Sequence, residues 1–272
     1  MDKGRILLVA AACGWSLSGV IIKSSSLDGL SIAWARSAVA ALFLLPWAWR
    51  RRQPIDGGTL FIALAYMGTV TLLVLATKAT TAANAIVLQY IAPAVVFVLG
   101  IPLLREYPKK AEWLALGLSL TGVGVIFVGA PAGQWPGIVL GVGSGIMFGL
   151  LIVGLRRYRD KDPYWTIFLN NAVVGLVLLP FVEWPGGDTA GFEGALMVVL
   201  GIVQLGLPYV LFFKAVKLVV AREAALISLL EPLLNPVWVA LVVGEIPNTA
   251  TQIGGGIVLI GVLLPYLYRK NN

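Results

Sequence analysis

Long apolar stretches alternate with short polar breaks along the whole chain, and this pattern predicts ten membrane-spanning helices. A helix needs about 20 mostly apolar residues to cross the hydrocarbon core of a bilayer. The predicted spans cover roughly residues 4–23, 30–49, 58–76, 83–104, 111–129, 136–155, 164–182, 193–214, 221–243 and 250–268. The breaks between them are short, so the pattern leaves no room for a soluble domain.

The composition agrees with an all-α membrane protein. Of the 272 residues, 59% are hydrophobic and 12% are charged, and the mean hydropathy is +0.91, whereas a soluble domain carries about 25% charged residues. The single cysteine, Cys13, excludes an internal disulfide and a multi-cysteine metal site, and the lack of histidine excludes histidine catalysis. We therefore expect no cofactor, and the net charge of +7 is not taken as a sign of nucleic-acid binding.

Lysine and arginine are distributed unequally between the two ends of the predicted spans. With a cytoplasmic N-terminus, 17 of the 20 lie on the cytoplasmic side: Lys3, Arg5, Arg50, Arg51, Arg52, Arg105, Lys109, Lys110, Arg156, Arg157, Arg159, Lys161, Lys214, Lys217, Arg222, Arg269 and Lys270. Lys23 and Lys78 lie on the outer side, and Arg36 lies within the second span. Because short cytoplasmic loops are rich in Lys and Arg, we expect a multi-pass protein of the bacterial inner membrane with both termini in the cytoplasm.

The ninth apolar stretch, from Ala221 to Glu245, carries an unusual polar pattern. Four residues recur at helical spacing and share one face: Ser228, Glu231, Asn235 and Trp238. A carboxylate inside a bilayer is costly and nearly always faces protein or a water-filled cavity. Pro232 and Pro236 also loosen the backbone beside this face. The pattern favours a helix that lines a pathway.

The chain contains an internal repeat with an ungapped offset of 139 residues. Between residues 82 and 123, 11 of 42 positions are identical to the residue 139 positions later, including Pro93 and Glu106. The repeat predicts two halves, residues 1–131 and 132–272, each with five spans. An odd number of spans makes the two halves cross the membrane in opposite directions. Inverted repeats of this kind are typical of transporters with a site near the bilayer midplane.

Several short motifs follow one another along the chain in a characteristic order. They are Gly14-Trp15-Ser16, Arg36, the run Lys-Ala-Thr-Thr-Ala-Ala-Asn-Ala over residues 78–85, Ala92-Pro93 with Glu106, and Leu230-Glu231-Pro232 with Gly244-Glu245. In this order they resemble the ten-span EamA-type members of the drug/metabolite transporter superfamily, which include aromatic amino-acid exporters of bacteria. The resemblance covers nearly the whole chain. It identifies the superfamily but no substrate.

The resemblance implies a basket of ten helices around a central cavity lined mainly by spans one, three, four, six, eight and nine. Proteins of this kind typically export amino acids or other small metabolites. The two halves of this chain differ at matched positions, because Phe148 stands where Trp15 is found and Asn170 stands where Arg36 is found. We therefore expect a chemically asymmetric site.

Twelve residues are candidates for the lining of this cavity. They are Trp15, Ser18, Tyr66, Gln89, Tyr90, Phe148, Gln204, Tyr209, Ser228, Glu231, Asn235 and Trp238. Each also has a structural interpretation, because aromatic rings pack inside helix bundles and polar groups link neighbouring helices through modest hydrogen bonds. Gln89 and Ser228 correspond by the 139-residue offset, so they predict either a substrate-binding pair or two interhelical contacts.

Charged residues within or beside the spans form a second set of candidates, for coupling or for structural support. Glu231 either binds a proton or a substrate ammonium group, since burial favours a neutral carboxyl, or it hydrogen-bonds the backbone loosened by the adjacent proline. Arg36 is expected to hold the fold by pairing with carbonyls or a carboxylate, and Lys78 to extend from a helix end toward water. Glu106 and Glu245 are expected to be structural partners of lysines or of backbone groups.

Glycines recur every four residues along the predicted sixth span. They are Gly137, Gly141, Gly145 and Gly149. Such a stripe predicts close packing against another helix. It also suits a helix that tilts or slides during a change of access.

Motifs of several other classes are missing from the sequence. It has no GxxxxGK[ST] loop, no HExxH motif and no Cys/His cluster, so we expect neither an ATP-driven pump nor an enzyme. The sequence predicts a secondary transporter that exports small metabolites by alternating access, with a bilayer, a small solute and, in one hypothesis, protons as partners. We expect no nucleic-acid partner and a monomer or weak homo-oligomer. A passive facilitator, a ligand-binding sensor or scaffold, and an anion exchanger remain alternatives.

Overall fold

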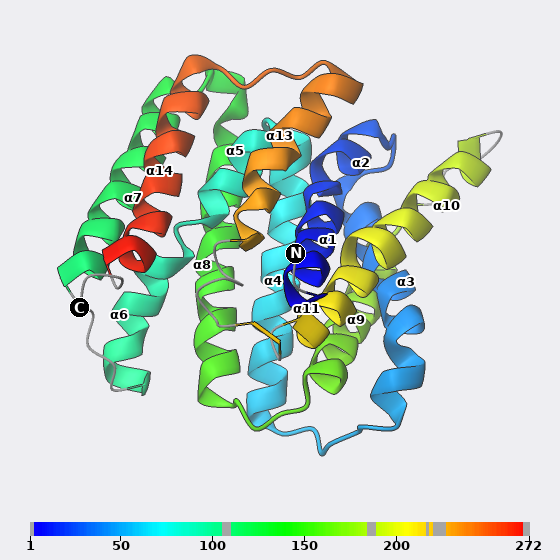
Figure 1. Cartoon of the computed structure of the whole chain (residues 1–272). Coiled ribbons are helices and arrows are strands. Elements are labelled where there is room, and N and C mark those ends of the chain that lie inside the picture. The colour runs from blue at the N-terminus through cyan, green and yellow to red at the C-terminus, as the bar shows by residue number, and fades with distance from the viewer. Residues whose placement is uncertain (1–2, 105–109, 184–188, 216–217, 220–226, 269–272) are drawn as a thin grey trace.

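The computed structural model describes residues 3–104, 110–183, 189–215, 218–219 and 227–268 (Figure 1). Within these ranges the regular elements are all helical, as predicted for an all-α membrane protein. Seven helices are long and apolar enough to cross a membrane, and three shorter apolar helices accompany them. Together they make up the ten predicted spans.

Spans one to five are formed by α1 (Lys3–Ser16) with α2 (Ser18–Ser24), α3 (Gly29–Trp49), α4 (Gly57–Ala79), α5 (Ala82–Gln89) with α6 (Ala92–Leu104), and α7 (Lys110–Gly129). A 3₁₀ turn (Ala132–Gln134) leads into span six. Spans six to ten are formed by α8 (Trp135–Arg157), α9 (Pro163–Leu178) with a 3₁₀ turn (Leu179–Phe181), α10 (Ala190–Val199) with a π-helical turn (Leu200–Gly206) and α11 (Leu207–Ala215), α13 (Leu230–Val243), and α14 (Thr249–Tyr268).

The predicted span boundaries agree closely with the helices. Eight spans begin one residue before the predicted start, and span eight begins three residues before it. Residues 220–226, where the ninth span was predicted to begin, lie outside the described residues.

Three spans are interrupted within their length. Span one breaks at Leu17, span four at Tyr90 and Ile91, and span nine has a turn residue at Leu229. Tyr90 and Leu229 are 139 residues apart, so the breaks in spans four and nine fall at equivalent positions of the repeat. Each of these two breaks is followed within three residues by a proline, which lacks the N–H for the helical hydrogen bond.

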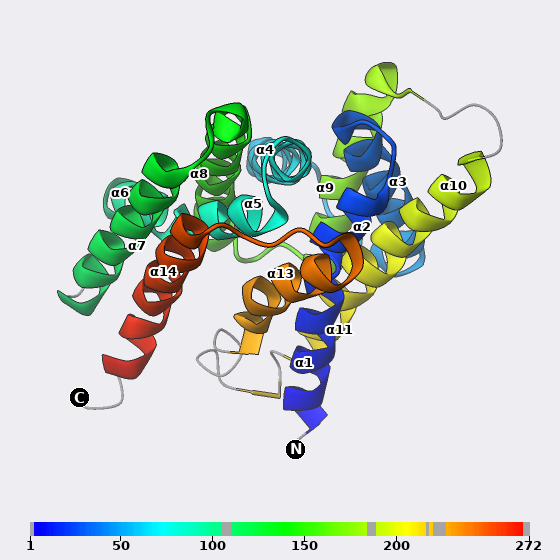
Figure 2. The same ribbon diagram turned by 90° about the horizontal axis from the view of Figure 1, so that it is seen from above.

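The main helix packings repeat when spans one to five are exchanged for spans six to ten. The contact of α4 with α8 corresponds to that of α1 with α11, and the contact of α5 and α6 with α8 corresponds to that of α1 and α2 with α13. The pairs α3–α9, α5–α13 and α7–α14 correspond to themselves. Seen from above, α4 and α8 run side by side, with α7 and α14 on one flank and α3, α9 and α10 on the other (Figure 2).

The glycine stripe of α8 packs directly on span four, as predicted. A Cβ atom built on Gly145 would lie 2.8 Å from the carbonyl oxygen of Leu88 and 3.0 Å from that of Gln89. One built on Gly149 would lie 2.9 Å from the carbonyl oxygen of Ala92. The stripe therefore covers the backbone at the break of span four, where Pro93 cannot donate to the carbonyl of Gln89.

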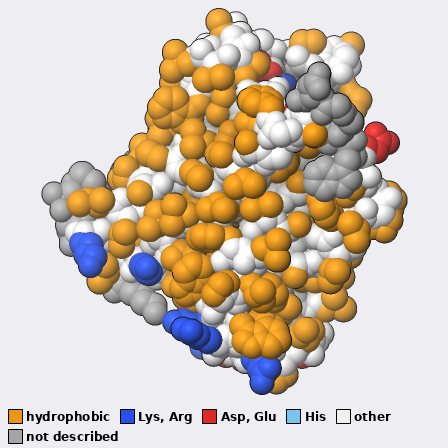
Figure 3. Space-filling view, turned by 90° about the vertical axis from the view of Figure 1, so that its right-hand side faces the viewer, with side chains coloured by type: hydrophobic (Ala, Val, Ile, Leu, Met, Phe, Trp, Pro, Cys, Tyr) orange, Lys and Arg blue, Asp and Glu red, His pale blue; other side chains and the backbone are white. Residues whose placement is uncertain are grey.

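Positive side chains gather at one end of the molecule. Hydrophobic side chains cover most of the face in Figure 3, and Lys and Arg lie along its lower edge. The α3–α4 and α8–α9 loops lie at this end (Figure 1), where Lys161 Nζ is 2.8 Å from Asp56 Oδ1 and the N–H of Asp162 donates to Gln53. The hydrogen bond from Lys161 and those from Thr59 in the capping box hold the pKa of Asp56 well below its usual range.

We expect Gly145→Ala to destabilise the protein by about 1–3 kcal/mol, because the added methyl group overlaps two carbonyl oxygens in a packed seam. The control is Gly124→Ala in α7, where a Cβ meets no atom within 4 Å. A helical glycine in open space gains about 0.5–1 kcal/mol on conversion to alanine. Thermal unfolding of the purified protein in detergent measures both changes, and equal behaviour of the two variants would contradict the packing assignment.

Candidate functional site

Span one and span nine are joined by two hydrogen bonds on either side of the break in span one. Trp238 Nε1 donates to Ser16 Oγ at 2.9 Å, and Asn235 Nδ2 donates to Ser18 Oγ at 3.0 Å. Ser16 Oγ in turn donates to the carbonyl of Cys13 at 2.7 Å, a bond that competes with regular helix geometry. The predicted polar face of span nine therefore points toward span one at Asn235 and Trp238.

Trp15 forms the contact between span one and an aromatic group on α11. Its ring centroid lies 5.3 Å from that of Tyr209 and 5.4 Å from that of Phe212. Gln204, in the π-helical turn of span eight, donates from Nε2 to the carbonyl of Trp15 at 3.5 Å, while its Oε1 is buried without a partner among the described residues. π-Helical turns occur frequently at functional sites, and this one lies directly against the predicted aromatic wall.

Glu231 lies in the first turn of α13, directly after the break in span nine. It is half-buried, and no described residue donates a hydrogen bond to its carboxyl group. The carboxyl lies close enough to Tyr90 and Tyr209 to interact with their hydroxyl groups electrostatically. Glu231 therefore faces the protein interior between spans four, eight and nine.

Arg36 is buried in span two, with 1% of its surface exposed. Its Nη2 donates to the carbonyl of Val70 at a long 3.4 Å, and its Nε has no hydrogen-bond partner among the described residues. The predicted carbonyl partner is thus present, whereas no ion pair with a described carboxylate is formed. Arg36 lies within electrostatic range of Tyr66 and Tyr209, and Glu231 lies within electrostatic range of the same Tyr209.

Tyr66 is almost fully buried, and its position is set by span seven. Its hydroxyl donates to Asn171 Oδ1 at 3.1 Å, and Asn171 Nδ2 donates to the carbonyl of Ile167 at 2.9 Å. The neighbouring Asn170, which matches Arg36 in the repeat, has a buried Oδ1 without a described partner. Spans two, three and seven thus bring several polar groups together on the Arg36 side of the interior.

Gln89 forms a hydrogen bond between helices, which agrees with its structural interpretation. Its Nε2 donates to Ser144 Oγ at 3.0 Å, and Ser144 donates to the carbonyl of Thr69 at 2.8 Å. This chain links spans four, six and three. Ser228, its counterpart in the repeat, is half-buried. Phe148 packs against the main hydrophobic cluster of the interior.

Two further candidates lie at the upper end of the molecule, away from these groups. Lys78 is in the last turn of α4 and donates to the carbonyl of Ser25 at 2.9 Å, which agrees with its predicted place at a helix end. Glu245 accepts a hydrogen bond from the N–H of Ala82 and pairs with Lys23, so its predicted structural role is confirmed. The corresponding prediction for Glu106, like Lys217, lies outside the described residues.

Sequence reasoning missed several polar residues that hold the spans in place. Glu193, which is 3% exposed, accepts hydrogen bonds from the hydroxyls of Ser25 and Ser26 at 2.6 and 2.7 Å. Asn171 and Ser144 hold the predicted residues Tyr66 and Gln89. Two features of the sequence could have identified them: the acidic Glu193 at the start of an apolar span, and the adjacent Asn170 and Asn171 within another.

The arrangement suits a small solute with two unlike ends. A guanidinium and a carboxyl group, neither in an ion pair with a described residue, both lie within electrostatic range of the same tyrosine, whose ring contacts Trp15. Among the described residues there is no cluster of three His, Cys, Asp or Glu side chains that could hold a metal ion. Charge pairing and aromatic contact are therefore the chemistry that these residues offer.

The comparison with protein families decides the class. The model of the EamA-like transporter family matches residues 2–128 and again residues 135–267. The chain belongs to the EamA-like transporter family. This membership confirms the resemblance drawn from the motifs, and it identifies a multi-pass membrane transporter.

Two curated relatives match this chain along nearly its full length. An uncharacterised transporter of Archaeoglobus fulgidus is 28% identical over 268 residues, covering 98% of this chain and 97% of the relative. A second from the same organism is 26% identical over 285 residues, covering 97% of each. A solved structure described only as "Crystal structure of protein" has a TM-score of 0.66 at 17% identity and covers 99% of both chains. It supports the fold alone.

We expect the contacts between spans one and nine to be energetically coupled. In a double-mutant cycle, Ser18→Ala and Asn235→Ala should show a coupling free energy of about 0.6 kcal/mol, the usual value for interhelical hydrogen bonds in membranes. Ser18→Ala combined with Gln252→Ala, whose side chain donates to the carbonyl of Pro247 just before α14, should be additive. Thermal unfolding of the four proteins in each cycle provides the measurement, and additivity in the first cycle would refute the contact.

Proposed function

We propose that this EamA-like transporter is a secondary active transporter that exports amino acids or similar small metabolites by alternating access. The observation that carries the proposal is the placement of Arg36 and Glu231 in the interior, both near Tyr209. An α-amino acid carries a carboxylate and an ammonium group, which match these two side chains in charge. Trp15 and Tyr209 supply an aromatic wall for the remainder of the solute.

Two inverted halves, residues 1–131 and 132–272, are the proposed moving units. The 139-residue offset and the exchange of equivalent helix packings support this division. Interrupted helices at equivalent positions of spans four and nine support a site near the middle of the bilayer, where such breaks bind substrates in transporters. Rocking of one half against the other would expose that site to each side in turn.

The proposed location is a bacterial inner membrane, with both termini in the cytoplasm. The strongly unequal distribution of Lys and Arg supports this orientation. It makes the end that holds Lys161 and Asp56 the cytoplasmic end, and the end that holds Lys23 and Glu245 the outer end.

The test of the function is flux in proteoliposomes. A panel of amino acids, amines, carboxylic acids and phosphorylated metabolites is first screened for thermal stabilisation of the purified protein, and each ligand found is then supplied in labelled form. Flux of an amino acid above that of empty vesicles supports the proposal. Binding without flux would favour a ligand-binding scaffold, and downhill flux indifferent to the proton gradient would favour a passive facilitator.

We expect Glu231→Gln to abolish the response of amino-acid flux to an imposed pH gradient, because the amide cannot bind and release a proton. The wild-type protein should transport faster when the gradient drives protons opposite to the solute. Asp56→Asn, which neutralises a carboxylate at the end of the molecule that holds Lys161 while keeping a capping residue, should retain the response. An unchanged response in Glu231→Gln would assign this residue a structural role.

We expect Arg36→Gln to weaken the binding of ligands that carry a carboxylate by about tenfold or more, since an ionic hydrogen bond is replaced by a neutral one. Binding of the matched amine without a carboxylate should change little. The comparison uses ligand-dependent thermal shifts or calorimetry on variants whose unfolding remains cooperative. Equal loss of both ligands would show that Arg36 maintains the fold rather than selecting the solute.

A further inference from the structure

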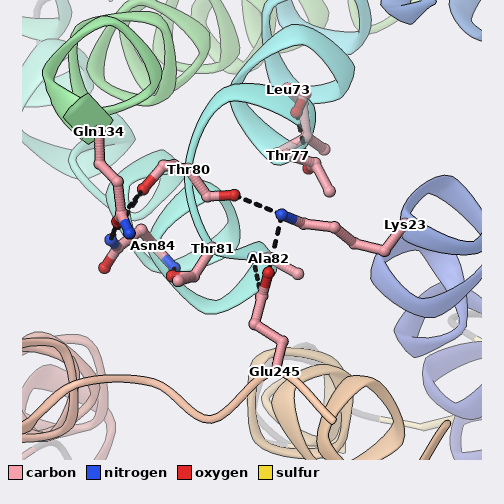
Figure 4. Close-up of polar contacts among 9 residues, drawn as sticks. All are labelled: Lys23, Leu73, Thr77, Thr80, Thr81, Ala82, Asn84, Gln134 and Glu245. Atoms are coloured by element: carbon pink, nitrogen blue, oxygen red, sulfur yellow. Dashed lines mark hydrogen bonds and ion pairs between the residues drawn. The ribbon is translucent and has the colours of Figure 1, made fainter. Parts of the chain in front are cut away.

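An ion pair and a backbone turn meet at the upper end of the molecule. Lys23 Nζ, in the last turn of α2, lies 2.7 Å from Oε2 of Glu245, which follows α13. The same Nζ donates to the carbonyl of Thr80 at 2.6 Å, and the N–H of Ala82 donates to Glu245 Oε1 at 2.7 Å (Figure 4). Thr80 and Ala82 flank the turn between spans three and four. The ion pair is thus bound to this turn by two hydrogen bonds: Lys23 donates to Thr80, and Glu245 accepts from Ala82.

The four residues connect two separately packed groups of spans. Spans eight and nine both pack on span one, through α11 and α13 against α1, and spans three, four and six pack on one another through α4, α5 and α8. Lys23 and Glu245 belong to the first group, and Thr80 and Ala82 belong to the second. The contact therefore crosses the seam where α13 faces α5.

Local backbone features position each side of this contact. Gly244 ends α13 with a φ of 75°, a left-handed conformation that directs the chain away from the helix at Glu245. Thr81 caps α5, so Ala82 is the first helical residue and its N–H has no acceptor within the helix. The carboxylate of Glu245 supplies that acceptor.

One other polar link crosses the same seam, because Lys78 of span three donates to the carbonyl of Ser25 after span one. Two further links stay within one group. Glu193, at the start of span eight, binds Ser25 and Ser26 after span one. At the opposite end, Lys161 and Asp56 join the loop after span six to the start of span three. Both links brace spans that already pack together, so they do not oppose a separation of the two groups.

We propose that Lys23, Glu245, Thr80 and Ala82 form an outer latch, which closes the outer end of the pathway and separates when that end opens. The inference rests on the alternating access proposed above. The side chains of Lys23 and Glu245 are 17% and 20% exposed, so water can solvate both charges, the Thr80 carbonyl and the Ala82 N–H once the groups part. Contacts of this kind can be broken and remade in each cycle.

The test measures access to the seam from the outer side. Cys13, the single native cysteine, is replaced by Ala, and Leu17→Cys is introduced as a reporter. Leu17 is partly buried against the cluster that also contacts Met67 and Phe148 of one group and Trp238 of the other. The rate of labelling by a membrane-impermeant maleimide in right-side-out vesicles then reports how often the outer end opens.

Two variants each weaken one part of the latch with little other change. Ala82→Pro deletes the N–H that Glu245 binds, while proline suits the first position of a helix and the extended backbone of Thr81 tolerates it (ψ 149°). Glu245→Gln keeps the size of the side chain but removes its charge. Each should raise the labelling rate about tenfold, the effect of losing one hydrogen bond to a charged group.

The matched control is Gly57→Pro, the same substitution at the first residue of α4, where a Cβ meets no atom within 4 Å. It should leave the labelling rate unchanged. The exchange Lys23→Glu with Glu245→Lys restores an ion pair but places a carboxylate against the Thr80 carbonyl and an ammonium group against the Ala82 N–H. It should label as fast as the single variants.

Unchanged labelling in both Ala82→Pro and Glu245→Gln, with cooperative unfolding retained, overturns the latch. Equal acceleration in Gly57→Pro overturns it too, because the reporter would then sense general loosening. Recovery of slow labelling in the charge exchange would show that the ion pair suffices without the two hydrogen bonds to the turn. The labelling needs no substrate, so a failed latch is distinguishable from a failed transport function, which the flux assay tests separately.

Discussion

Backbone groups inside a bilayer need partners from the protein, since lipid offers none, and this constraint governs where the interrupted helices lie. At the break of span four, Pro93 leaves the carbonyl of Gln89 without its helical donor. The carbonyl of Leu88 accepts from the N–H of Ile91, and Gly145 brings span six against the carbonyls of Leu88 and Gln89, which excludes lipid from them. Span six must therefore carry small residues along this face.

The break of span one is joined to a neighbouring span by different chemistry. Ser16 and Ser18 accept hydrogen bonds from Trp238 and Asn235 of span nine, where the equivalent seam between spans four and six relies on glycines. The packing of the two halves is thus equivalent, whereas the side chains that achieve it are not. The polar seam between spans one and nine adjoins Trp15 and the π-helical turn, so the asymmetry of the site begins with how each break is covered.

Charged side chains form ion pairs at the two ends of the molecule, whereas Arg36 and Glu231 in the spans form none with a described residue. At the ends, Lys23 pairs with Glu245 and Lys161 with Asp56, where partial exposure keeps the cost of each charge low. In the interior, Arg36 has one long hydrogen bond to a carbonyl and Glu231 has no described donor. Burying the Arg36 guanidinium without compensation is unfavourable, and a solute that brings a carboxylate to it would stabilise it. This contrast between satisfied ends and unsatisfied interior separates structural residues from candidates for function.

Three properties could be predicted from the sequence alone: the ten spans, most of them to within one residue of their start, the enrichment of Lys and Arg at one end, and the close packing of the α8 glycines. These properties depend on hydrophobic length, on charge and on residue size, which are local. Only the tertiary structure decided that Gln89 meets Ser144, that Tyr66 meets Asn171 and that Glu193 meets Ser25 and Ser26. The physical reason is that an almost uniformly apolar helix reveals its depth in the membrane but not its rotation about its own axis, which is set by partners distant along the chain.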